Sequence, residues 1–127
     1  MTLPRWLILL ASIILFGAGL LHLIGYSFLI PALVKAGVVP GIVGAVKAVW
    51  FIFTVELVIL SPALVWIGRL SRARSLLLYL SLIPLADAIL MYHYVGLFIG
   101  TYMVAGGALL LLAGAWLLPH GETPAAK

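Results

Sequence analysis

The fold of this chain follows from its first long apolar stretch, residues 6–26, which read WLILLASIILFGAGLLHLIGY. As a helix this stretch measures about 30 Å, the thickness of the hydrocarbon core of a bilayer. It contains no Asp, Glu, Lys or Arg, and Trp6 and Tyr26 stand at its ends as aromatic anchors for the two membrane interfaces. The stretch therefore predicts a transmembrane helix. A cleavable signal peptide is disfavoured because the stretch is long and lacks a clear A-x-A site.

Three more apolar stretches of similar length follow, at residues 45–68, 75–94 and 97–118. The whole chain is 66% hydrophobic and only 8% charged, which is too apolar for a soluble domain of 127 residues. We therefore predict an all-α membrane protein, a four-transmembrane-helix bundle formed as one domain by residues 1–118. The polar residues 119–127 are expected to form a disordered cytoplasmic tail.

The longest connection, residues 27–44, is itself mostly apolar. Pro31 is suited to the first turn of a helix and Gly37 to the position after its last turn. Backbone polar groups cannot face lipid unpaired, so the segment must lie at the interface or be covered by protein. It predicts a short interfacial or re-entrant helix between the first two spans.

The basic residues are distributed unequally between the two sides of the predicted bundle. One side has Arg5, Arg69, Arg72, Arg74 and Lys127, and the other has only Lys35 and Lys47. The positive-inside rule then places both termini in the cytoplasm, with the chain in the cytoplasmic membrane. The net charge of +4 comes from these scattered helix ends, so the lipid bilayer is the expected partner and nucleic acid is not.

Small residues recur in the first and fourth spans, at Gly17-Ala18-Gly19 and at residues 105–108 and 113–115. Small side chains let transmembrane helices approach closely. They predict packing faces between helices of one subunit. Homo-oligomerisation through the fourth span is the alternative.

Two of the three acidic residues, Glu56 and Asp87, lie inside predicted spans. A carboxyl group within the hydrocarbon region is costly, so it is expected to face the protein interior or a wet cavity and to carry a function. Counted by helix rise from the outer boundary, Glu56 lies about 16 Å deep, Asp87 about 10 Å and His22 about 6 Å. The structural alternative is that these groups only join helices, or repair the kink expected at Pro84.

We expect a cavity that opens to the extracytoplasmic side, with binding or proton-carrying residues Glu56, Asp87, His22, Lys47, Tyr26 and Tyr94. Catalytic residues are not assigned, and the spacing indicates no metal site. A haem held by His22 and His93 is not expected, because the two histidines differ in depth. No cofactor is therefore predicted.

Three functions fit this pattern. The first is binding or transport of a small apolar or cationic molecule in the cavity, with protonatable Glu56 and Asp87. The second is a membrane enzyme that performs acid/base chemistry on a hydrophobic substrate, as an isomerase, a cyclase or an epoxide-opening enzyme. The third is an accessory subunit whose buried charges only specify helix pairing.

Overall fold

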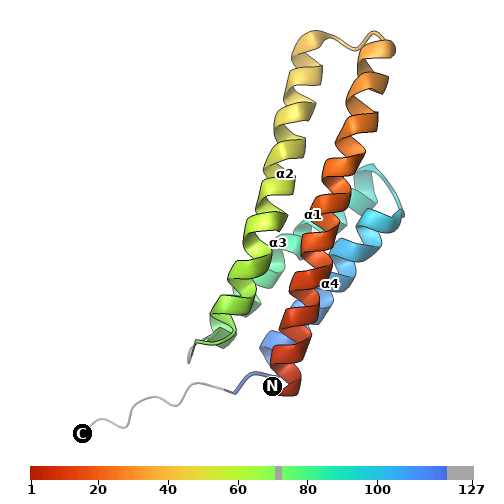
Figure 1. Cartoon of the computed structure of the whole chain (residues 1–127). Coiled ribbons are helices and arrows are strands. Elements are labelled where there is room, and N and C mark those ends of the chain that lie inside the picture. The colour runs from red at the N-terminus through yellow and green to blue at the C-terminus, as the bar shows by residue number, and fades with distance from the viewer. Residues whose placement is uncertain (71–72, 120–127) are drawn as a thin grey trace, which may run out of the picture.

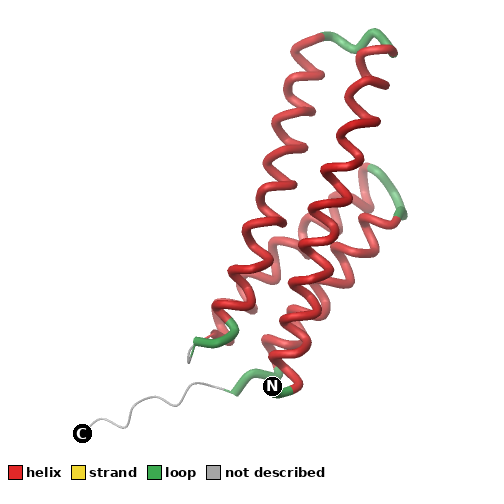
Figure 2. The backbone as a smooth tube through the Cα atoms, in the orientation of Figure 1, coloured by secondary structure: helices red, strands yellow, loops and turns green. Residues whose placement is uncertain are grey.

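The computed structural model describes residues 1–70 and 73–119, and in these residues the chain forms helices and no strands (Figure 2). The helices are α1 (Leu3–Lys35), α2 (Pro40–Ile67), α3 (Ala73–Tyr94) and α4 (Ile99–Trp116). Each is long and apolar enough to cross a membrane. The predicted four-helix membrane bundle is confirmed. Arg72 and residues 120–127 of the expected tail lie outside the described residues.

The four helices form two antiparallel hairpins, α1–α2 and α3–α4 (Figure 1). Helix α1 packs extensively against both α2 and α4, and α3 packs against α4. Helices α2 and α3 follow one another in the chain but barely touch. The bundle is therefore well packed along three helix pairs and open along the fourth.

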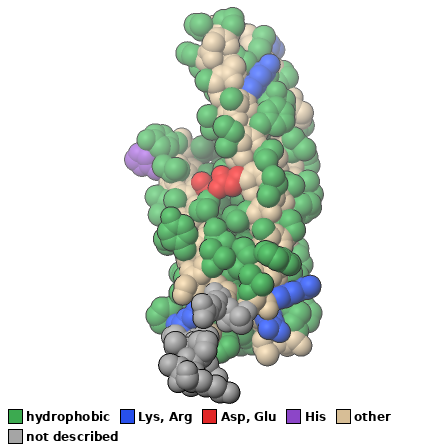
Figure 3. Space-filling view, turned by 90° about the vertical axis from the view of Figure 1, so that its left-hand side faces the viewer, with side chains coloured by type: hydrophobic (Ala, Val, Ile, Leu, Met, Phe, Trp, Pro, Cys, Tyr) green, Lys and Arg blue, Asp and Glu red, His purple; other side chains and the backbone are tan. Residues whose placement is uncertain are grey.

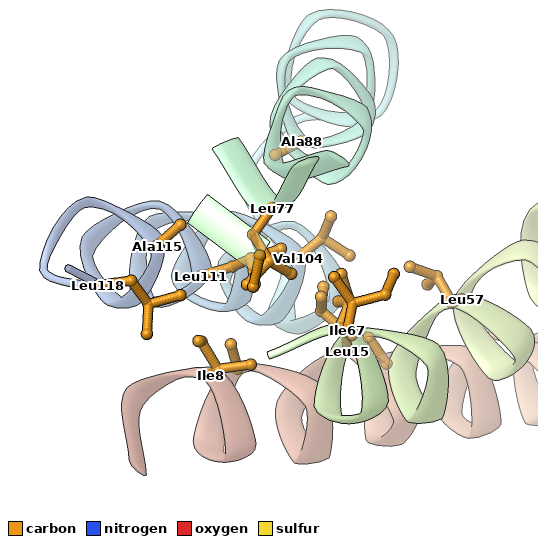
Figure 4. Close-up of a cluster of buried hydrophobic side chains, with 14 residues drawn as sticks. Ile8, Leu15, Leu57, Ile67, Leu77, Ala88, Val104, Leu111, Ala115 and Leu118 are labelled. Atoms are coloured by element: carbon orange, nitrogen blue, oxygen red, sulfur yellow. The ribbon is translucent and has the colours of Figure 1, made fainter. Parts of the chain in front are cut away.

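Small residues bring the packed pairs together. A Cβ atom on Gly19 would lie 3.2 Å from Cβ of Leu57, at the contact of α1 with α2. A Cβ on Gly107 would lie 2.7 Å from Cγ of Leu15, at the contact of α1 with α4. Leu15 and Leu57 belong to the main apolar cluster, which α1, α2, α3 and α4 all contribute to (Figure 4). Glycines of the first and fourth spans thus pack helices of one chain together, and an oligomer through α4 stays a prediction.

The connection between the first two spans differs from the prediction. Residues 27–35 continue α1, and α2 begins at Pro40, so no separate interfacial or re-entrant helix exists there. Pro31 lies inside α1. Its ring removes one N–H donor, but ending the helix at that point would leave several more backbone groups unpaired in apolar surroundings. Gly37, with φ of 74°, ends α1 instead, because glycine tolerates this left-handed conformation.

The two hairpins differ in length. Helix α1 has 33 residues and α2 has 28, about 50 and 42 Å, whereas α3 has 22 and α4 has 18, about 33 and 27 Å. The α1–α2 hairpin therefore extends past the turn between α3 and α4 (Figure 1). Helices α3 and α4 coincide closely with the third and fourth predicted spans, and α1 and α2 run beyond the first two.

Candidate functional site

A pocket of about 490 Å³ lies between α1, α2 and α3, on the side where α2 and α3 barely touch. We call it the α2–α3 pocket. Its walls are mainly apolar, and His22, Trp50 and Asp87 supply its polar side-chain groups. The apolar part includes Val46, Val49, Phe53, Leu90, Met91 and Val95. This volume and this lining are typical of a site that binds a small molecule and orients it with a few polar groups.

A second pocket of about 390 Å³ lies beside the first and extends between α1 and the beginning of α4. We call it the α1–α4 pocket. His22, Trp50 and Phe53 line both pockets, as do Met91 and Val95. The pockets thus share one wall, which is built mainly of aromatic rings.

Asp87 brings an unsatisfied carboxyl group to the α2–α3 pocket. Its Oδ2 atom is buried and has no hydrogen-bond partner among the described residues. Half-buried Glu56, on α2, is close enough to Asp87 for the two carboxyl groups to interact electrostatically. Figure 3 shows the acidic side chains together halfway along the molecule, beside a hollow in its surface. An unpaired buried acceptor is costly, so a bound group that donates to Asp87 would stabilise this arrangement.

The shared aromatic wall is held by a cycle of hydrogen bonds between α1 and α2. His22 Nδ1 lies 2.9 Å from Thr54 Oγ1. The Thr54 hydroxyl donates to the Trp50 backbone oxygen at 2.9 Å, and Trp50 Nε1 donates to the His22 backbone oxygen at 2.7 Å. The His22 and Trp50 rings stack with centroids 3.9 Å apart. These bonds fix the position of both rings.

Gly25 provides the space for the Trp50 indole. A Cβ atom at position 25 would lie 3.1 Å from Cζ2 of Trp50, closer than ordinary van der Waals contact. Glycine therefore lets the indole lie against α1, where its N–H reaches the His22 backbone oxygen.

The same cycle matches one of the two tautomers of His22. A hydroxyl group has one hydrogen, and while that of Thr54 points to the Trp50 backbone oxygen, Thr54 Oγ1 can only accept from the ring, so the matching tautomer has its proton on His22 Nδ1. In the neutral imidazole, Nε2 is then an acceptor. Nε2 has no hydrogen-bond partner among the described residues, and it is not buried. Two side chains that line the α2–α3 pocket, His22 and Asp87, thus carry an acceptor without a partner among the described residues, and the indole donor is already used.

Replacing Trp50 with phenylalanine should lower the free energy of unfolding by about 0.5–1.5 kcal/mol. The change keeps an aromatic ring but removes the interhelical hydrogen bond to the His22 backbone oxygen. Unfolding in detergent, followed by circular dichroism, measures the loss. Trp66→Phe is the control, because Trp66 is exposed and forms no such bond among the described residues, and it should change stability little. Equal effects of the two changes would contradict the role given to Trp50.

The structure places the six predicted site residues unequally. His22 and Asp87 line the α2–α3 pocket, and Glu56 lies close enough to interact with Asp87. Lys47, Tyr26 and Tyr94 do not line either pocket. Helix geometry and packing explain these three positions, and the reason differs for each residue.

On α2, the pocket-lining residues Val46, Val49, Trp50 and Phe53 recur at helical spacing, which turns exposed Lys47 off that face. Tyr26 packs its ring against Phe51 with centroids 4.8 Å apart. Tyr94 is 78% exposed at the end of α3. His93 is also exposed there, packs edge-on against Tyr94 and lines neither pocket.

Sequence reasoning missed Trp50, Phe53 and Thr54 as parts of the site. One signal was available for Trp50. Tryptophan in membrane proteins is enriched at the interfaces, whereas this one lies within the second predicted span. No comparable signal marked Phe53 or Thr54, because phenylalanine and threonine are ordinary residues of transmembrane helices.

The site is an open, mainly apolar pocket whose lining side chains carry hydrogen-bond acceptors. Such a pocket suits a molecule that has an apolar body and a positive charge or a donor group. Comparison of this chain with family models, with curated proteins and with solved structures finds no match.

Proposed function

We propose that this protein binds, and carries across or within the membrane, a small apolar or cationic molecule held in the α2–α3 pocket. The observation that supports this most directly is the unpartnered carboxyl group of Asp87, with its buried Oδ2 atom, at a mainly apolar pocket. A bound cation would compensate the charge of this carboxyl group, and its apolar body would replace lipid or water against the walls.

The electrostatic interaction of Asp87 with nearby Glu56 favours a cation over a neutral ligand. The two carboxyl groups interact electrostatically, and no described Lys or Arg forms an ion pair with either. When both carboxyl groups are ionised, their negative charges repel one another in these apolar surroundings. Either a proton or a bound cation relieves the repulsion. Competition between proton and cation at one carboxyl group supplies a simple means of coupling release to proton uptake.

The distribution of basic residues favours one orientation of the bundle in the membrane. Arg5, Arg69 and Arg74 lie at the end of the bundle that holds the N-terminus, and Lys35 and Lys47 lie toward the other end. The positive-inside rule assigns the N-terminal end to the cytoplasm of a cell whose cytoplasmic membrane holds the protein. The α2–α3 pocket then belongs to the outer half of the membrane.

One observation favours the enzyme as a second candidate. His22 and Asp87 line the same pocket, so an imidazole and a carboxyl group face one volume, as acid/base isomerisation, cyclisation or epoxide opening requires. An enzyme would convert a bound hydrophobic substrate, whereas a binding protein or transporter would return it unchanged. Recovery and chemical analysis of the bound molecule separates these two functions.

Tryptophan fluorescence tests the proposal. The chain has four tryptophans, so replacing Trp6, Trp66 and Trp116 with phenylalanine leaves Trp50 as the reporter in the pocket wall. Titration of this variant in lipid nanodiscs with benzylammonium should give a saturable change of emission. A matched variant that keeps only Trp116, which lines neither pocket, should show only the linear response of partition into lipid. A linear response in both variants would contradict binding and favour the accessory role.

A further inference from the structure

We propose that the α2–α3 pocket selects a ligand by its N–H groups, and that this ligand is a primary or secondary ammonium on an apolar body. A quaternary ammonium of the same shape is a poor ligand. The inference rests on the proposed function and specifies the class of molecule that the same pocket takes.

The first support is the set of polar groups that the pocket offers. Oδ2 of Asp87 is buried without a partner, and Nε2 of His22 is an acceptor without a partner among the described residues. The third polar group, Trp50 Nε1–H, already donates to the His22 backbone oxygen. A ligand must therefore bring donors, because an acceptor on the ligand would find no free donor on these three side chains.

The second support is that the contacts between α1 and α2 favour the tautomer of His22 in which Nε2 accepts. In this tautomer Nδ1–H donates to Thr54 Oγ1, and the Thr54 hydroxyl keeps its hydrogen bond to the Trp50 backbone oxygen. In the other tautomer the Thr54 hydroxyl would have to turn from the Trp50 backbone oxygen and donate to His22 Nδ1, which breaks the hydrogen bond between Thr54 and Trp50. The packing of α1 against α2 thus favours the form of His22 in which Nε2 accepts.

The third support is the way the aromatic rings face one another. A quaternary ammonium is usually bound by open faces of several aromatic rings. Here the His22 ring covers one face of Trp50 at a centroid distance of 3.9 Å, and Phe53 packs against the His22 ring at 4.7 Å. His22 and Trp50 stack, and Phe53 meets the His22 ring edge-on, so the three rings pack on one another and do not form the open cage that a quaternary ammonium needs. It would also leave Asp87 Oδ2 and His22 Nε2 without hydrogen bonds.

A methylation series tests the inference on the reporter chain that keeps Trp50. Benzylammonium, its mono- and dimethyl derivatives, and benzyltrimethylammonium share one apolar body and one charge and differ in their N–H donors. Affinity should fall along the series, by about tenfold or more between the first and the last, as expected when a charged hydrogen bond is lost. Equal or tighter binding of benzyltrimethylammonium would overturn the inference and leave the proposed function standing. Failure of every member to bind would instead contradict the proposed function.

Two variants connect the selectivity to His22. His22→Phe keeps a ring to stack on Trp50 but has no acceptor, so the preference for benzylammonium should fall several-fold, with little change for benzyltrimethylammonium. Thr54→Val removes the acceptor that fixes Nδ1–H and should reduce the preference partly. Circular dichroism checks that both variants fold. An unchanged preference for benzylammonium over benzyltrimethylammonium in folded His22→Phe would overturn the role of His22. The methylation series on the unaltered pocket does not depend on either variant.

Discussion

Replacing Gly107 with alanine is expected to destabilise the bundle by about 1–3 kcal/mol, the usual effect of overpacking a well-packed contact. The added Cβ atom would lie 2.7 Å from both Cγ and Cδ2 of Leu15, which is fully buried, so the neighbouring side chain cannot simply turn away. Helix α4 would have to move from α1. Unfolding of the purified protein in detergent, followed by circular dichroism, measures the change.

The chain offers a matched control at the adjacent glycine. A Cβ atom on Gly106 would meet no heavy atom within 4 Å, so Gly106→Ala should be neutral or stabilise α4 by up to about 1 kcal/mol. Combining Gly107→Ala with Leu15→Ala should destabilise less than the sum of the two single changes, because the smaller Leu15 side chain makes room for the new methyl group. Similar effects at positions 106 and 107 would contradict the packing described for α1 and α4.

Replacing Asp87 with asparagine should weaken benzylammonium binding by about ten- to a hundredfold. Asparagine has nearly the same shape but cannot be ionised, so the change removes a charge-assisted hydrogen bond worth about 1.5–3 kcal/mol without emptying the pocket. Titration of the chain that keeps Trp50 as reporter measures the affinity. Benzyl alcohol, which has the same ring and one donor but no charge, should lose clearly less affinity than benzylammonium on the change from the parent chain to Asp87→Asn.

Glu56→Gln is the companion variant, and it should have the smaller effect. Glu56 interacts with Asp87 but does not line the α2–α3 pocket, so its charge acts on the ligand at longer range. We expect a change in benzylammonium affinity of a few-fold. A larger loss from Glu56→Gln than from Asp87→Asn would show that the cation is held at Glu56 and would contradict the site described above.

The candidate site was only partly predictable from the sequence. Glu56, Asp87 and His22 were found because polar and ionisable residues are rare inside spans, so each is visible against an apolar background. Tyr26 was included because it lies four residues after His22 on the same helical face, and Lys47 because it could reach Asp87 or His22 on another helix. Spacing along one helix does not say how that helix is turned toward its neighbours, and the structure places both residues outside the two pockets.

The apolar segment of residues 27–44 shows a related limit. Pro31 restricts the backbone around it, and Gly37 permits a left-handed conformation. The sequence does not say, however, whether a proline starts a helix or lies within one. Contacts between neighbouring helices decide this. Buried Ile30 and Val43 show that the chain packs on both sides of the turn, so α1 and α2 continue as one long hairpin.

The sequence by itself determined that the chain forms four membrane-spanning helices, because the bilayer sets both the length and the apolar composition that a spanning helix must have. Only the tertiary structure decided which faces of these helices meet. Lipid is as apolar as the protein interior, so hydrophobic residues occur on every side of such a helix and do not mark its buried face. Close approach at Gly19 and Gly107, and the separation of α2 from α3, arise from the shapes of the packed helices. That separation forms the pocket that His22 and Asp87 both line.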